Sequence, residues 1–439
     1  MTLEDCLRRN ANLWPLRTAV TAAGQSCTYS QLLRRVELRA ASIAEPGRIV
    51  PLRAAPTIGF LVDYLAIHAA GATAAPLDKN LPQPLMDQME RQVEGKTAPE
   101  GTADVLFTTG TTGKPKGVMI SHRAIMANAQ NLALAQQYSA GLTFIIAGPL
   151  NHIGSLSKIY PTLLVGASLH IVDGLRDVNA LFAAIDDAPA KVATFLVPAS
   201  VAMLLRFAKK QLAAAAHKID FIETGAAPIP LANMTALCQT LPHSRLYNTY
   251  ASTETGIIAT FNFNSGECLQ GCLGEPMRNS AIEISPEGKV VCSGSTIMTG
   301  YLDDDHATSQ VLADGKIHTS DLGFIDPRGR LRLSGRADDV INVAGLKVSP
   351  AEVEEAALTM EQITDCVCVA VEHPLSGMSL KLLYVADSDL DKRAIALHLK
   401  ARLESYKVPM LYQRVERVHR TFNGKIDRKK YTPQKPGGR

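Results

Sequence analysis

The sequence predicts an α/β protein with a large N-terminal domain and a small α+β C-terminal domain, and three observations carry this prediction. The chain has 439 residues, which at ~100–200 residues per domain correspond to two or three domains. Short apolar runs alternate with helix-like runs before about Glu283, a pattern typical of parallel-rich sheets covered by helices. After Glu283 the pattern becomes period-two alternation broken by turn residues, which is typical of antiparallel hairpins.

The elements expected in the N-terminal part follow from these runs. The longest apolar stretch, Thr57–Pro76, contains Asp63 and His68, so we interpret it as a packed helix and not as a membrane span. Further along, the pattern predicts strands at 144–148, 193–197 and 221–222 and helices at 124–138, 200–215 and 231–240. Their alternation predicts layers of helices on a sheet.

The C-terminal part divides into two regions. Residues 283–337 predict a β-rich subdomain that completes an N-terminal domain of residues 1–337. Beyond it, Ser349 is an expected N-cap before Pro350, CVCVAV predicts a strand, and 392–405 predict a helix. We therefore expect a small α+β domain over residues 338–439, of which only the last residues, PQKPGGR, form a loose tail.

Composition excludes several classes of protein. Hydrophobic residues make up 46% and charged residues 20% of the chain, which excludes disordered, collagen-like and coiled-coil proteins. The formal net charge of +3 is too small for an affinity based on phosphate neutralisation, so duplex nucleic acid is not an expected partner. The eight scattered cysteines contain no zinc-like spacing, and the charged N-terminus lacks a signal-like apolar segment, so we expect reduced thiols and a cytoplasmic location.

A loop rich in glycine, threonine and lysine is the most informative stretch. The sequence TTGTTGKPKG follows the strand-like ADVLF and offers many backbone N–H and hydroxyl donors together with two lysines, a combination suited to wrapping phosphate oxygens. Pro115 stands where a Walker-type P-loop has its lysine, so the loop is of another type. Its candidate phosphate-binding residues are Thr108, Thr109, Gly110, Thr111, Thr112, Gly113, Lys114 and Lys116.

This loop and the motifs that follow it resemble the adenylate-forming superfamily, which contains acyl- and aryl-CoA synthetases, peptide-synthetase adenylation domains and luciferases. The family loop [ST]-[ST]-G-[ST]-T-G-x-P-K-G is matched from Thr108 to Gly117, and the other motifs follow in the family's order as far as NGKIDR. The resemblance implies the predicted two-domain fold, with ATP, Mg²⁺ and either CoA or a carrier-protein phosphopantetheine as reactants and cofactors.

The resemblance also implies roles in nucleotide binding. Tyr250 would stack on adenine, Thr253 would lie near the α-phosphate, Glu254 would bind Mg²⁺, and Asp321 would accept hydrogen bonds from the ribose hydroxyls. An aromatic face, a hydroxyl and hard carboxylates suit these partners chemically. Small or motif residues expected to line the nucleotide and acyl group are Gly225, Ala226, Ala227, Asn248, Thr249 and Ala251.

At the junction between the domains the resemblance implies a moving part. Arg336 would contact ribose or phosphate, Asp338 would be the hinge, and Gly345 with Lys347 would line the thiol tunnel. Lys425 would be the catalytic lysine that bridges the attacking carboxylate and the α-phosphate. The alternative for Asp338 is a residue that caps a turn or pairs with a neighbouring arginine.

The substrate class is narrowed by two departures. Adenylation domains for amino acids carry an aspartate near Asn151 and His152, and none stands here, so an amino acid is not expected. His152 resembles the histidine beside the carboxylate pocket of acyl- and aryl-CoA ligases, although a packed core histidine is the alternative. Ala251 leaves room for an acid larger than acetate, so we expect a medium-chain or aromatic acid.

The residues between Asp78 and Asp104 number about 25, so roughly one βαβ unit of ~30 residues is expected to be missing relative to longer family members. Three function classes remain. A CoA ligase comes first, an enzyme that loads a carrier protein second, and a luciferase-like oxygenase or an inactive binder last.

Overall fold

The computed structural model describes residues 1–439 apart from 44–45, 110–114, 344–345, 374–376, 422–424 and 432–439. The side chains of Thr109, His373, Gly377 and Lys429 are likewise outside the described part. The loop residues Gly110, Thr111, Thr112, Gly113 and Lys114, together with Gly345 and the C-terminal tail, therefore lie outside it.

The largest sheet has eight strands and is mostly parallel. In sheet order its strands are β12 (Gly256–Asn262), β11 (Arg245–Ser252), β10 (Ile219–Gly225), β9 (Val192–Leu196), β7 (Thr143–Ile146), β8 (Ser168–Ile171), β1 (Thr18–Ala22) and β2 (Gln25–Thr28). Only the outer pairs, β11 with β12 and β1 with β2, are antiparallel. The parallel-rich sheet predicted from the alternating runs is thus confirmed.

A second sheet carries the phosphate-loop motif. Its strands, in order, are β16 (Gly300–Tyr301), β6 (Pro115–Ser121), β5 (Thr102–Thr109), β4 (Thr73–Leu77) and β3 (Ile49–Arg53). Strands β3, β4 and β5 are parallel, whereas β5 and β6 form the antiparallel pair that flanks the glycine-rich loop. The short segment between Asp78 and Asp104 contains one helix, α4 (Gln83–Val93), which connects β4 to β5.

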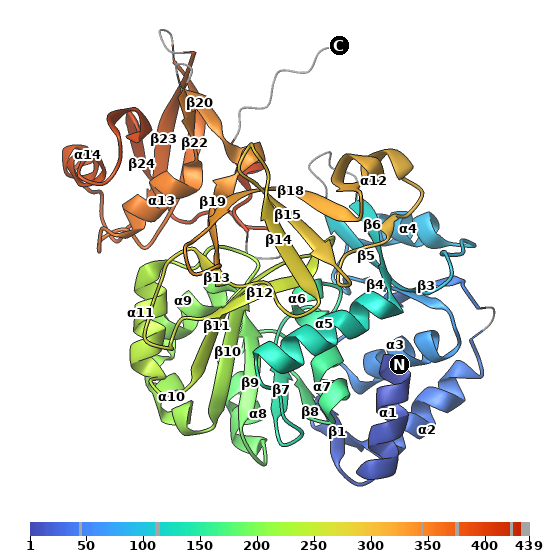
Figure 1. Ribbon diagram of the computed structural model, residues 1–439. Helices are drawn as coiled ribbons and strands as arrows, with labels where there is room; N and C mark the ends of the chain where they lie inside the picture. Colours follow the sequence, from blue (N-terminus) through green and yellow to red (C-terminus); the bar gives the residue numbers. More distant parts are fainter. Residues whose placement is uncertain (44–45, 110–114, 344–345, 374–376, 422–424, 432–439) are drawn as a thin grey trace.

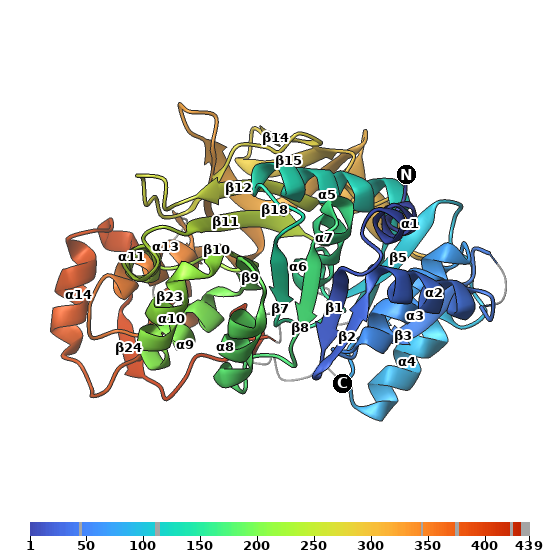
Figure 2. The same cartoon turned by 90° about the horizontal axis from the view of Figure 1, so that it is seen from below.

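Helices cover these two sheets (Figure 1, Figure 2). They are α1 (Leu3–Leu13), α2 (Tyr29–Ala40), α3 (Ile58–Ala69), α5 (His122–Ala135), α6 (Ile153–Leu156), α7 (Ile159–Val165), α8 (Val178–Asp187), α9 (Pro198–Phe207), α10 (Lys209–Ala214) and α11 (Leu231–Thr240). One core joins both sheets to α1, α2, α3, α5, α6 and α7, whereas α8 to α11 form a second core with the large sheet. The helix predicted over 200–215 is divided at Ala208, where the backbone leaves helical geometry. The described residues contain no helix that is both long and apolar enough to cross a membrane.

The β-rich sheet lies above these layers. Its strands are β13 (Cys272–Gly274), β19 (Leu331–Arg336), β18 (Lys316–Ile325), β15 (Lys289–Gly294) and β14 (Ser280–Ile284), with β17 (Leu312–Ala313) paired to β18 and α12 (Asp305–Val311) beside it. All its pairings are antiparallel, as the period-two pattern predicted. The sheet begins earlier than the predicted stretch, because β13 joins it through β19.

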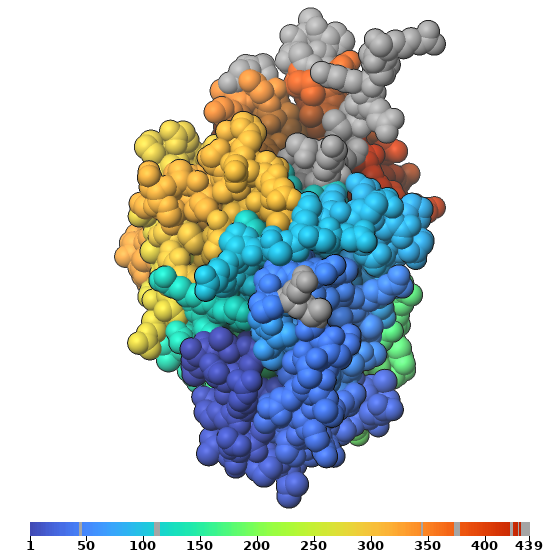
Figure 3. Space-filling model, turned by 90° about the vertical axis from the view of Figure 1, so that its right-hand side faces the viewer, coloured from blue at the N-terminus to red at the C-terminus, as the bar shows by residue number. Residues whose placement is uncertain are grey.

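The C-terminal residues have a small hydrophobic core of their own. The surface view in Figure 3 shows this part of the chain, in orange and red, toward the upper end of the molecule. Its elements are β20 (Ile341–Val343), β21 (Leu346–Val348), α13 (Pro350–Leu358), β22 (Asp365–His373), β23 (Gly377–Val385), α14 (Lys392–Lys400) and β24 (Leu411–Arg414). Ser349 stands at the N-cap position of α13, but its hydroxyl donates to the Ser334 carbonyl and accepts no hydrogen bond from the N–H groups of the helix. The helix predicted over 392–405 ends at Lys400.

A buried charge cluster supports β5, the strand that leads into the phosphate loop. The ring of His68 on α3 lies with Nε2 2.9 Å from Asp104 Oδ1 and Nδ1 3.3 Å from Glu4 Oε1. Tyr64 donates to the other oxygen of Asp104 at 2.9 Å. Burial acts to lower the pKa of His68, but its contacts with Asp104 and Glu4 outweigh burial and raise the pKa to about 10. The cluster therefore connects α1 and α3 to β5 through a protonated imidazole.

This cluster predicts a loss of stability in mildly alkaline solution. Between pH 6.5, the ordinary pKa of histidine, and about pH 10, folded His68 keeps a proton that unfolded chains release, so the free energy of unfolding falls as the pH rises. Urea unfolding at pH 6, 8 and 9.5 should show this decrease, and it should be much smaller in His68→Gln. An equal pH dependence in both proteins would contradict the role of His68.

Candidate active site

The candidate site is built where the parallel strands β9, β10 and β11 end, a common place for ligands in open α/β sheets. The turn from β11 to β12 carries Thr253 and Glu254, both partly buried. The β-rich sheet contributes Asp321 on β18 and Arg336 on β19, which are directly opposite each other in the antiparallel register. Residues from two sheets therefore meet at one edge.

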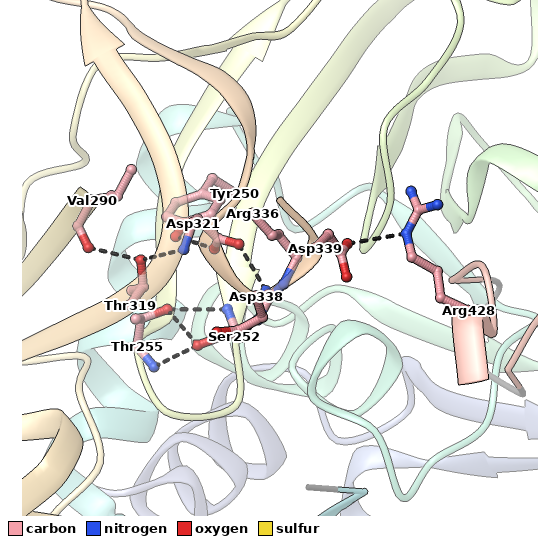
Figure 4. Close-up of polar contacts among 10 residues, drawn as sticks. All are labelled: Tyr250, Ser252, Thr255, Val290, Thr319, Asp321, Arg336, Asp338, Asp339 and Arg428. Atoms are coloured by element: carbon pink, nitrogen blue, oxygen red, sulfur yellow. Dashed lines mark hydrogen bonds and ion pairs between the residues drawn. The ribbon is translucent and has the colours of Figure 1, made fainter. Parts of the chain in front are cut away.

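Asp321 is the centre of a hydrogen-bond network (Figure 4). Its Oδ2 accepts from the Tyr250 hydroxyl at 2.7 Å, and its Oδ1 accepts from the Arg336 guanidinium at 2.7 Å. Its backbone N–H donates to Thr319, whose hydroxyl in turn donates to the Val290 carbonyl. Burial and the neighbouring Asp321 charge raise the pKa of Tyr250, so this phenol stays neutral and donates.

Glu254 lies in a second group with Lys116. The hydroxyl of Tyr301 donates to Glu254 Oε1 at 3.0 Å, and the ammonium of Lys116 lies 4.9 Å from the centre of the Tyr301 ring. Tyr301 is brought there because β16 pairs with β6, the strand that follows the glycine-rich loop. The arrangement places a cation and a carboxylate beside the loop.

His152 stands just before α6 and is partly buried. Burial lowers the pKa of His152 to about 4; the charge of Asp78 opposes this and that of Lys425 adds to it. The imidazole is therefore neutral near pH 7. Because the Lys425 charge acts on His152, the exposed Lys425 side chain belongs to the same region although it comes from the C-terminal domain.

Small residues bring two backbones close together beside this edge. A Cβ on Gly225 would lie 2.8 Å from the Thr249 carbonyl oxygen, and Ala226 adopts a left-handed φ of 68°. Ala251 is partly buried at the end of β11, whereas Asn248 and Thr249 use their side chains in the core, with Asn248 donating to the Cys272 carbonyl and Thr249 contacting Thr260.

The predicted junction between the domains falls in the short 3₁₀ turn η2 (Ala337–Asp339). Asp338 is exposed and contacts the Arg336 guanidinium at 3.4 Å, which is the arginine pairing weighed above as an alternative. Asp339 accepts from Arg428 Nε at 3.2 Å, and Arg428 also donates to both oxygens of Glu354 at 2.7 and 2.9 Å. Arg428 thus joins the segment that carries Lys425 to the residue after the proposed hinge.

The structure brings together Tyr250, Asp321, Arg336 and Asp338, and separately Lys116 with Glu254 and His152 with Lys425. Thr108 lies partly buried on β5 opposite Lys116, and Lys347 is exposed on β21.

Four residues with contacts at the site were missed by the sequence analysis: Lys158, Glu223, Tyr301 and Arg428. Lys158 gave a usable signal, as a single charge inside an otherwise apolar run.

Comparisons with known proteins indicate which family the chain resembles. The family model described as AMP-binding enzyme matches residues 86–302, and the AMP-binding enzyme C-terminal domain matches residues 352–425. Feruloyl-CoA synthase of Amycolatopsis is 27% identical over 95% of this chain and 96% of its own. Tyrocidine synthase 3 of Brevibacillus parabrevis is 25% identical over 98% of this chain, which spans only 8% of that protein.

A solved structure shows the same fold. The o-succinylbenzoate CoA synthetase of Bacillus subtilis, in complex with its acyl-adenylate intermediate, superposes with a TM-score of 0.85 at 22% identity and 99% coverage of both chains.

Proposed function

Because this chain belongs to the family of AMP-binding enzymes, we propose that it is an AMP-forming acid–thiol ligase. In the first step a carboxylate oxygen attacks the α-phosphorus of ATP and pyrophosphate leaves. In the second step a thiol attacks the acyl carbon, AMP leaves with the bonding electron pair, and the thiol proton passes to solvent or a base. CoA is the proposed thiol, supported by the near full-length similarity to a feruloyl-CoA synthase.

The Tyr250–Asp321–Arg336 network is the observation that carries the proposal. It presents an aromatic ring, a carboxylate and a guanidinium at the carboxyl edge of the sheet. One carboxylate oxygen accepts from Tyr250 and the other from Arg336. These groups suit a purine face, a ribose diol and a phosphate respectively. On the other side of the site, the neutral His152 and the Lys425 charge suit the reacting carboxylate.

Glu254 is the proposed ligand of Mg²⁺. This ion commonly binds through one or two carboxylates, substrate phosphates and water, so a single carboxylate beside the phosphate loop fits it. When bound, the ion would neutralise charge on the leaving pyrophosphate.

The acceptor and the location complete the proposal. A carrier-protein phosphopantetheine is the second candidate acceptor, favoured by the similarity to a segment of tyrocidine synthase 3. A cytoplasmic location fits the eight free cysteines, of which seven have a pKa raised by burial.

The testing experiment separates the two steps. Labelled pyrophosphate should exchange into ATP only when a suitable acid is present, and a panel of alkanoic and aromatic acids would locate it. Addition of CoA or of a loaded carrier protein, followed by mass measurement of the thioester, identifies the acceptor. No exchange with any acid of the panel would overturn the proposal.

Asp321→Ala should weaken ATP binding without unfolding the protein. The substitution removes hydrogen bonds to charged groups worth ~1.5–3 kcal/mol, so we expect the KM for ATP to rise ~10- to 100-fold. Pyrophosphate exchange at varied ATP concentration measures this. Asp305→Ala, an exposed aspartate on α12, is the control and should leave the KM unchanged. Equal KM values for ATP in the two variants would contradict a role of Asp321 in nucleotide binding.

A further inference from the structure

A fully buried ion pair lies in the large sheet below the candidate site. Lys158, between α6 and α7, and Glu223, on β10, each have a side chain that is 1% exposed. The Lys158 ammonium donates to Glu223 Oε1 at 2.7 Å and lies 2.7 Å from Oε2. Burial lowers the pKa of Lys158, while the Glu223 charge acts against that shift. Charges buried this deeply are rare unless they have a function or full compensation.

The pair is next to the residues proposed to hold the acid. Glu223 pairs in register with Phe195 on β9, and the Lys158 ammonium lies 5.1 Å from the centre of the Phe195 ring. The same ring is the nearest neighbour of Gly154, where a Cβ would lie 3.1 Å from it, and it also borders Gly225 at 3.6 Å. Phe195 is only partly buried. Its ring therefore connects the His152 segment, the Gly225 segment and the ion pair.

The positions of Glu223 and Gly225 on β10 indicate how far the ion pair lies from the candidate site. Glu223 precedes Gly225 by two residues on β10, so both side-chain positions face the same side of the sheet, ~7 Å apart at the usual rise per residue. An acid whose carboxylate lies beside His152 and Gly225 would place its opposite end near the pair if it has roughly the length of a benzene ring with one substituent.

The polar groups around the pair are not all satisfied by the described residues. Within the described part of the chain, the Lys158 ammonium donates a hydrogen bond only to Glu223, although it has three N–H groups. Glu223 Oε2, although 2.7 Å from this ammonium, has no partner with hydrogen-bond geometry, and the hydroxyls of Tyr138, Ser157 and Thr224 also lack partners. Burial, together with the Glu223 charge, raises the pKa of Tyr138 well above its usual value. A buried polar group without a partner costs ~1–3 kcal/mol, so spare donors and acceptors here favour a polar ligand group.

Resting on the proposed function, we propose that the Lys158–Glu223 pair is a specificity subsite that selects aromatic acids carrying a hydroxyl or amino group opposite the carboxylate. A hydroxyl on the substrate can accept a hydrogen bond from a second N–H of Lys158 and at the same time donate one to Glu223 Oε2. An apolar substituent of the same size makes neither of these hydrogen bonds, and sites built to hydrogen-bond a hydroxyl discriminate strongly against analogues that lack it.

The test compares 4-hydroxybenzoate with 4-methylbenzoate, since hydroxyl and methyl groups are similar in size. In acid-dependent pyrophosphate exchange, the wild type should favour the hydroxy acid by at least tenfold in kcat/KM. The double variant Lys158→Met/Glu223→Leu keeps the volume but removes the charges, a replacement often tolerated in buried pairs, and should favour the methyl acid. Calorimetric binding of the two non-hydrolysable acyl-sulfamoyl-adenosine analogues provides a second readout.

The control is the ion pair between Asp220 on β10 and Arg245 on β11, whose charged atoms are 2.6 Å apart at the ends of these strands opposite the candidate site. Asp220→Asn/Arg245→Met should leave the ratio of the two acids unchanged. If the double variant at the subsite does not fold, the kcat/KM ratio of the two acids is compared between the wild type and Glu223→Gln. A wild-type ratio near one, or an unchanged ratio in the folded variants, overturns the subsite, whereas exchange with no acid at all overturns the proposed function instead.

Discussion

Lys425→Ala is expected to slow adenylation ~30- to 1000-fold while leaving the thioester-forming step active. The Lys425 charge reaches the His152 region, where negative charge builds between the carboxylate and the α-phosphate as they approach. Loss of one such preorganised contact typically costs ~2–4 kcal/mol, which corresponds to ~30- to 1000-fold in rate. Acid-dependent pyrophosphate exchange measures adenylation, and release of AMP from synthetic acyl-adenylate by CoA measures the second step.

The control for this experiment lies on the same segment. Lys430 is exposed in the short 3₁₀ turn η4 (Arg428–Lys430), and Lys430→Ala should leave both rates unchanged. The segment itself stays in place in both variants because Arg428 remains bound to Glu354 and Asp339. An equal loss in the two steps of Lys425→Ala would show that the residue supports the fold of the domain and not adenylation.

Asp338→Pro is expected to preserve pyrophosphate exchange and to reduce thioester formation at least a hundredfold. Lys425 and a thiol cannot both approach the acyl group in one placement of the C-terminal domain, so the domain must turn between the steps, and such turns concentrate in a few residues. Asp338 lies in the 3₁₀ turn η2, whose usual φ is within the range of proline. Proline therefore fits the observed conformation and prevents others.

Asp338→Ala separates the hinge role from the contact with Arg336. This variant removes the carboxylate that lies 3.4 Å from the guanidinium but leaves the backbone free to turn. Exposed pairs of this kind contribute ~0–1 kcal/mol, so both half-reactions should stay within a few-fold of the wild type. If Asp338→Ala and Asp338→Pro behave alike, or if both steps survive in Asp338→Pro, the hinge assignment is wrong.

Several features of the site were accessible from the sequence because they are local. Tyr250 and Glu254 are four residues apart on one strand and its turn, and Lys116 follows a loop whose composition indicates phosphate binding. The proposed roles of these residues remain predictions. The break at Ala208 and the early end of α14 were not visible, because apolar periodicity continues across both points while packing against neighbouring elements decides where a helix stops.

By itself, the sequence determined the fold class, the change from a parallel-rich part to antiparallel hairpins along the chain, and the candidate motif residues, since periodicity and turn chemistry act over short distances along the chain. Only the tertiary structure decided which distant residues meet. Asp321 and Arg336 lie opposite each other because of the strand register. Tyr301 contacts Glu254 because β16 pairs with β6. Lys158 forms its ion pair with Glu223 across the core. Such pairs depend on the order of strands in the sheet and on burial. Burial excludes water and makes an unpartnered charge costly. Neither property can be predicted from the residues next to either partner in the sequence.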